Sequence, residues 1–201
     1  MSINKILSAV ALAAAAVAAN AAVVKPGDAA VAVSPPFGMA SELVTTQYSA
    51  FGLVFSQTAV FSDPPLAWGG VNADGVVDLV SPINAYFVLP STTSNAVTDF
   101  LSVEIGYANV GALTLEAFDI HGNLLGSTLN DDGLGPNGRT LATLSLSGIH
   151  SFRVSGADTW GMNQVEFGNL TAAVPEPETY ALMLAGLAAV GAFARRRQQQ
   201  R

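Results

Sequence analysis

The sequence predicts an all-β protein, an antiparallel β-sandwich that lies between two apolar chain ends. Charged residues are only 11% of the 201-residue chain, which also holds 19 Gly and 10 Pro. This composition favours a turn-rich β protein over a helical one. Short segments also alternate between apolar and polar residues with a period of two, the pattern of a strand with one buried face. An orthogonal β-barrel is the alternative architecture.

The first 21 residues have the pattern of a secretory signal peptide. Met1 to Lys5 is a short basic start, residues 6–19 form an apolar run, and Ala19-Asn20-Ala21 fits the small-x-small rule for cleavage. We therefore expect a signal helix that is removed after Ala21, with Ala19 and Ala21 as the residues read at the cleavage site. The alternative, a packed N-terminal helix, would need a polar face that this Ala-rich run lacks.

Residues 22–39 contain three prolines, and we interpret them as a linker or edge segment ahead of a folded body at 40–170. The clearest alternation lies at 101–107 and 113–117. Residues 113–129 look like a β-hairpin whose turn, His121-Gly122-Asn123, tolerates positive φ. Further strand candidates are 50–55, 76–80, 85–89, 140–147, 151–154 and 164–167. About eight such strands with no helix between them indicate two sheets packed face to face.

Charge is segregated along the chain. Residues 22–178 hold all 15 acidic residues but only three basic ones, Lys25, Arg139 and Arg153. An acidic surface repels phosphate backbones, which argues against nucleic acid as a partner. The chain has no Cys, so disulfides and thiolate metal sites are excluded.

The C-terminus combines three features. Pro175-Glu176-Pro177 resists helix formation because each Pro fixes φ and lacks an N–H. Residues 179–194 carry no charge and predict a short transmembrane helix, about 24 Å long. Arg195, Arg196 and Arg197 follow directly and would stay on the cytoplasmic side as a membrane stop. From these properties alone, a permanent anchor behind a plain linker is as good an interpretation as a processing signal.

The order and spacing of these three features closely resemble the PEP-CTERM sorting signal of Gram-negative bacteria. The resemblance covers about the last 28 residues, 174–201, including Leu-Ala-Gly-Leu-Ala-Ala-Val-Gly at 184–191. It implies that Pro175, Glu176 and Pro177 are the sorting motif read by exosortase, an integral-membrane transpeptidase. It also implies passage through an inner-membrane intermediate to the cell surface or the exopolysaccharide.

The body is similar to the jelly-roll ectodomain common among PEP-CTERM proteins, a relative of galactose-binding-like β-sandwiches. The segments that carry the resemblance are "SELVTTQYSAFGLVF", "LTLEAFDIHGNLLGSTL", "LSLSGIHSFRVSG" and "MNQVEFGNL". It implies a jelly-roll-like sandwich over most of 40–170. It transfers no ligand, because such folds serve many functions.

The sequence has no clear arrangement of catalytic residues, so we expect that the protein is not an enzyme. The two histidines, His121 and His150, fall in a turn and at a strand start, without the spacing of a metal pair. Glu104 and Glu116 lie on polar strand faces, where a solvated role is the simple interpretation; a glycosidase would need two carboxylates that face one cleft.

Two kinds of ligand site are predicted from loops. Asn72, Asp74 and Asp78 surround a Gly, and residues 130–132 form a similar acidic loop, so either could offer hard oxygens to calcium; ordinary Asx turns are the alternative. No other cofactor is expected. Trp68 and Trp160 lie among turn residues and could stack on a sugar, or could instead plug the ends of the sandwich.

These observations favour an exported cell-surface or matrix protein with a structural or adhesive role in exopolysaccharide or biofilm. The expected partners are signal peptidase and the export machinery, exosortase, the membrane before processing, and exopolysaccharide. The alternative is a glycan-binding module of the cell surface that uses a loop Trp and calcium.

Overall fold

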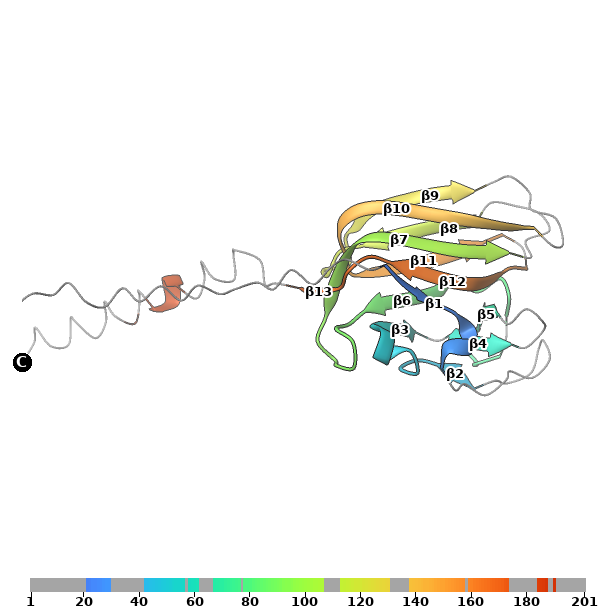
Figure 1. The fold of residues 1–201 in the computed structure, drawn as a ribbon, viewed down its shortest axis with the longest axis horizontal. Coiled ribbons are helices and arrows are strands. Elements are labelled where there is room, and N and C mark those ends of the chain that lie inside the picture. The colour runs from blue at the N-terminus through green and yellow to red at the C-terminus, as the bar shows by residue number, and fades with distance from the viewer. Residues whose placement is uncertain are drawn as a thin grey trace, which may run out of the picture.

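The computed structural model describes residues 21–29, 42–56, 58–61, 67–76, 78–106, 113–130, 138–157, 159–173, 184–187 and 190. These residues form two antiparallel sheets (Figure 1). The larger sheet contains β10 (Arg139–Ile149), β7 (Ala96–Gly106), β12 (Gly161–Phe167), β5 (Ala67–Gly70), β4 (Thr58–Phe61) and β2 (Leu43–Val44), with β1 (Ala22–Val24) beside β12 and β13 (Thr171–Ala172) beside β7. The smaller sheet has the order β3 (Leu53–Ser56), β6 (Ile83–Phe87), β11 (Ser151–Gly156), β8 (Leu113–Phe118) and β9 (Leu124–Asn130).

The two sheets bury one main core between their facing sides. Strand β8 illustrates the rule, because Leu113, Leu115 and Ala117 are buried while the residues between them are half-exposed. Aromatic side chains join the layers: the Phe87 ring lies 5.8 Å from Phe152 in its own sheet and 4.9 Å from Phe167 in the other, measured between ring centroids. Such packing is the main stabilising contribution of a sandwich. The predicted all-β, antiparallel class is confirmed.

The predicted hairpin at 113–129 is also confirmed, as β8 and β9. Gly122 has a φ of 81°, a conformation that costs a side-chain-bearing residue more than Gly. The Asp119 carboxylate accepts hydrogen bonds from the backbone N–H groups of His121 and Asn123 and from the Asn123 amide. These bonds hold the pKa of Asp119 below its usual value, the Asn123 side chain being the largest cause.

Two expectations about the elements differ from the structure. The described residues of the predicted strand 76–80 do not form one: Val76 makes a single β-bridge, the Asp78 N–H donates to the Gly70 carbonyl, and residues 79–80 lie in a turn. Ala22–Val24 form a strand paired with β12, and Val24 is fully buried. The folded body therefore includes residues well ahead of Met39.

The segment after β1 is tied into the core as well. A short 3₁₀ helix, η1 (Pro26–Asp28), follows β1, and a second one, η2 (Ser49–Phe51), precedes β3. The buried Tyr48 hydroxyl donates a hydrogen bond to the Pro26 carbonyl. Burial raises the pKa of Tyr48; contact with Trp68 opposes the rise, and the charge of Asp28 adds to it.

The predicted signal helix lies outside the described residues, apart from Ala21 at its end. Of the predicted transmembrane segment 179–194, the structure describes only 184–187 and 190, which are helical and exposed. Within the portions of the chain that are described, no helix has the length and apolar character needed to cross a membrane.

Candidate functional site

Both tryptophans are core residues. Trp68 is 0% exposed and Trp160 is 1% exposed. The Trp68 ring packs 5.3 Å from Tyr48 and 5.0 Å from Phe55, measured between centroids, and Trp160 lies against Gly156. The prediction that these two side chains contact a glycan is therefore wrong, because a fully buried ring has no face left for a sugar. The other interpretation, packing inside the sandwich, holds.

The acidic loop at 72–78 is built from turns. The Asn72 side-chain oxygen accepts the N–H groups of Asp74 and Val76, while the Asp78 carboxylate accepts from Val80 N–H and the Ser81 hydroxyl. Oxygens used in this way are Asx-turn acceptors. Among the residues the structure describes, no three His, Cys, Asp or Glu side chains are grouped so as to hold a metal ion. Asp131 and Asp132 lie outside those residues.

The candidate catalytic residues are dispersed. His121 is exposed in the β8–β9 turn. His150 has a structural contact: its Nδ1 lies 2.8 Å from the carbonyl oxygen of Ala96, the first residue of β7. Glu104 belongs to β7 in the larger sheet and is paired with Arg139 at 2.8 Å, whereas Glu116 belongs to β8 in the smaller one. The two carboxylates therefore do not face a common cleft.

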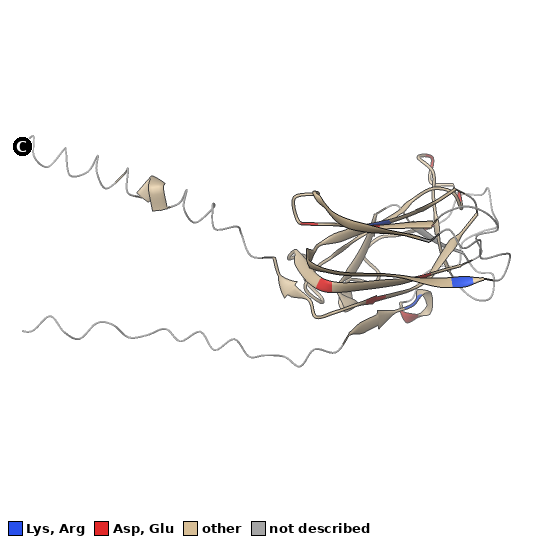
Figure 2. Ribbon diagram, turned by 90° about the horizontal axis from the view of Figure 1, so that it is seen from above, with Lys and Arg blue, Asp and Glu red and all other residues tan. Residues whose placement is uncertain are grey.

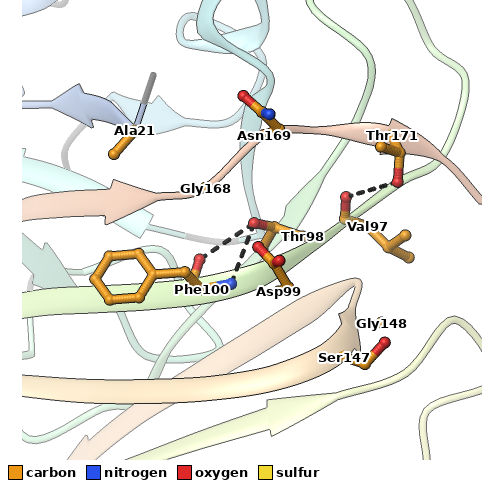
Figure 3. Close-up of a pocket in the computed structure, with 10 residues that line it drawn as sticks. All are labelled: Ala21, Val97, Thr98, Asp99, Phe100, Ser147, Gly148, Gly168, Asn169 and Thr171. Carbon is orange, nitrogen blue, oxygen red and sulfur yellow. Dashed lines mark hydrogen bonds between the residues drawn. The ribbon is translucent and has the colours of Figure 1, made fainter. Parts of the chain in front are cut away.

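The two ends of the folded body meet at one pocket. A depression of about 540 Å³ at the end of the sandwich is lined both by Ala21, the predicted cleavage residue, and by Thr171 of β13 (Figure 3). Asp99, Thr98 and Asn169 contribute polar groups to it. The Thr98 hydroxyl is already bonded to the Phe100 backbone, so this side chain stabilises the strand. Ala21 and Thr171 consequently lie at the same end of the sandwich.

Strand β13 fastens the end of the body to β7. Thr171 and Ala172 pair with Val97 and Ala96, and the Ala173 N–H donates to the Asn95 carbonyl at 3.0 Å. Only Val174 separates Ala173 from Pro175. The predicted sorting motif thus begins directly at the end of the folded body. Pro175, Glu176, Pro177 and Arg195 to Arg197 lie outside the described residues.

The outer face of the smaller sheet gathers further functional groups. Its strands pair in a register that aligns one row of side chains across the sheet, called here the aromatic row: Val54, Tyr86, Ser151, Phe118 and Leu124. A second row, the polar row, contains Ser56, Asn84, Arg153, Glu116 and Ser127. The residues between these positions on β6, β11 and β8 are buried, so the members of both rows on these three strands lie on the opposite, outer face of the sheet. Val54, at the β3 end of the aromatic row, is buried. No local pattern in the sequence indicates this face, because its residues come from separate strands.

Charged residues are few and scattered along the described part of the chain (Figure 2). On the outer face of the smaller sheet, Arg153 lies opposite Glu116 in register. The face thus holds a balanced pair within a body whose charge is strongly acidic.

Comparison with solved structures finds carbohydrate-binding modules at low similarity. CsCBM6-3 from Clostridium stercorarium, in complex with cellobiose, is 10% identical, with 73% of this chain and 92% of that chain covered and a TM-score of 0.37. CBM6cm-2 from Cellvibrio mixtus lichenase 5A, in complex with cellotriose, is 14% identical, with coverages of 57% and 88% and a TM-score of 0.32. A non-crystalline cellulose specific module, CBM28, is 12% identical, with coverages of 72% and 100% and a TM-score of 0.34. Scores this low assign no ligand to this chain.

No curated protein matches the sequence. The C-terminus, in contrast, matches a family model over residues 173–198, and that model describes the PEP-CTERM protein-sorting motif. The match begins at Ala173, the residue bonded to Asn95 at the end of the folded body. Such a motif indicates an exported protein that is sorted to the cell envelope. The β-sandwich of this chain is therefore followed directly by a PEP-CTERM protein-sorting motif.

Proposed function

We propose that this chain is an exported protein that exosortase processes at its C-terminal motif, and that its β-sandwich then serves as a structural or adhesive component of the exopolysaccharide at the cell surface. The match of residues 173–198 to the sorting motif carries the proposal. The N-terminal pattern at 1–21 supports it, since export precedes sorting. Signal peptidase, the export machinery and exosortase are the implied partners, and the membrane holds the C-terminal segment until processing.

The pocket in Figure 3 supports the proposal that both chain ends are removed. Ala21 and Thr171 line the same depression, so removal of both chain ends would leave one end of the sandwich with two new termini. The rest of the body would be left unchanged by processing. A body released in this way could remain folded throughout sorting.

A triple variant of the motif, Pro175→Ala with Glu176→Ala and Pro177→Ala, tests the proposal in the native cells. The variant should keep its tail, residues 195–201, and remain in the membrane fraction. The matched control is Gln199→Ala with Gln200→Ala, which lies beyond the matched segment and should be processed like the parent. Arrival of the triple variant at the surface with the parent's termini would refute the role of the motif.

A second candidate function, a glycan-binding module, is favoured by the outer face of the smaller sheet. That face combines rings, amide, guanidinium and carboxylate groups on neighbouring strands. This candidate depends neither on the buried tryptophans nor on calcium.

A further inference from the structure

The aromatic row offers two rings at a spacing suited to a chain of sugars. Tyr86 on β6 and Phe118 on β8 are both half-exposed, and both pair with Ser151 on the strand between them. Neighbouring strands are about 4.8 Å apart, so the two ring-bearing positions are separated by roughly 10 Å. The small side chain of Ser151 leaves the space between the rings open. In an extended glycan, two such rings would meet two sugars that have one further sugar between them, each stacking its apolar C–H face on a ring.

The polar row lies beside the aromatic row, two residues further along each strand, a step of about 7 Å. Arg153 is exposed between Asn84 and Glu116. A guanidinium donates, a carboxylate accepts and an amide does both. Sugar hydroxyls also donate and accept, so this mixed set complements them without a net charge.

A pocket extends the aromatic row past Tyr86. It measures about 500 Å³ and is lined by Tyr86 and by polar side chains that include Thr46, Ser49, Thr93 and Asn95. The Tyr86 ring centroid stands 6.0 Å from that of His150, whose Nδ1 is bonded to the Ala96 carbonyl. These contacts hold the Tyr86 ring in place before any ligand arrives, which lowers the entropic cost of binding.

We infer that the outer face of the smaller sheet binds a neutral, extended polysaccharide that lies across the strands, stacked on Tyr86 and Phe118 and hydrogen-bonded to Asn84, Arg153 and Glu116. The inference rests on the proposed function, because it names the ligand class of the exported body. The acidic body, residues 22–178, has three basic residues against 15 acidic ones, and this negative charge disfavours a polyanionic glycan.

The test uses the full chain and the extracellular polysaccharide of the native cells, separated by anion exchange into a neutral and an acidic fraction. Binding to each fraction is measured by affinity electrophoresis. The parent should be retarded by the neutral fraction. Tyr86→Ala and Phe118→Ala should each weaken binding about tenfold or more, and Arg153→Ala should weaken it without loss of a core contact. Tyr86→Phe keeps the ring and should bind nearly as the parent does.

The matched control is Phe100→Ala, which removes a ring from the pocket on the other sheet and should leave retardation unchanged. Thermal unfolding of every variant shows whether it is folded. If the Ala variants are folded and bind like the parent, the face is not the site, although the matrix role stands. If the parent is retarded only by the acidic fraction, the neutral ligand is wrong. If it binds neither fraction, the matrix role and the face both fail.

Discussion

Trp68→Ala should destabilise the fold severely, because this residue fills the centre of an aromatic cluster. The side chain is 0% exposed and its ring contacts those of Tyr48 and Phe55. A buried Trp removes roughly 200 Å² from water, worth up to about 5 kcal/mol at 25 cal/mol per Å². That value is an upper bound, since an unfolded chain already buries part of its surface.

Truncation of a core Trp to Ala generally costs about 3–5 kcal/mol, which agrees with this estimate. Such a loss is a large share of the roughly 5–15 kcal/mol by which a domain is stable. For a body of this size, each kcal/mol lowers Tm by about 2–4 °C, so the expected fall is roughly 6–20 °C.

Urea unfolding of the full chain, followed by circular dichroism, measures the effect. Trp68→Phe keeps a ring in the cluster and should lose clearly less stability than Trp68→Ala. Leu141→Ala is the control: this side chain is 60% exposed on β10, and its removal should change stability by no more than about 0.5 kcal/mol. Should Trp68→Ala unfold at the parent's urea concentration yet lose polysaccharide binding, Trp68 would be a ligand contact and the packing argument would be refuted.

Three further predictions concern single residues. Gly70→Ala should lower the free energy of unfolding by about 1–3 kcal/mol in urea, because the added Cβ would stand 2.1 Å from the Ser81 carbonyl oxygen. Gly27→Ala is the control, since its Cβ would have no atom within 4 Å, and equal stability of the two variants would contradict the close packing at Gly70. Because the pKa of Tyr48 is raised in the folded protein, the unfolded chain loses the hydroxyl proton at lower pH, and the free energy of unfolding should fall as pH rises above about 10. Tyr48→Phe should flatten that fall, and an unchanged slope would show that Tyr48 is not its cause. The lowered pKa of Asp119 predicts the opposite sign, a contribution present above about pH 3.9 and lost at lower pH; Asp119→Ala should reduce the acid dependence of unfolding, and a profile identical to the parent's would contradict this.

The sequence predicted the class of the fold because alternation and turn residues act locally. The hairpin around Gly122 is a clear example: the alternation on both sides and the turn chemistry lie within one short segment. Residues 76–80 were mispredicted because an apolar run looks like a strand, whereas the Asn72 and Asp78 side chains bind the backbone in turns. Residues 22–39 were interpreted as a linker or edge segment, and the pattern could not decide between the two because the partner of β1, β12, lies at the other end of the body.

The functional residues likewise divide into those that a local sequence pattern reveals and those that only the folded chain brings together. The sorting motif is a contiguous signal and needs no tertiary structure to be found. Tyr86 and Phe118, in contrast, come together only through Ser151, since β11 inserts between β6 and β8. The separation of these residues along the sequence gives no sign that they lie in one row across the sheet. The sequence left Trp68 open between glycan contact and packing because its Gly-rich and Pro-rich neighbours suggested a loop, while the residue itself lies on β5, inside the larger sheet.

The most direct test of the account is the intact mass of the protein recovered from the native cell surface, with both terminal peptides sequenced. The account predicts a chain that begins at Ala22 and ends between Glu176 and Thr179, with any group added by the transpeptidase visible as extra mass at that end. A surface protein that still carries Arg195 to Arg201 would mean that the tail is a permanent anchor, and would contradict processing at the motif.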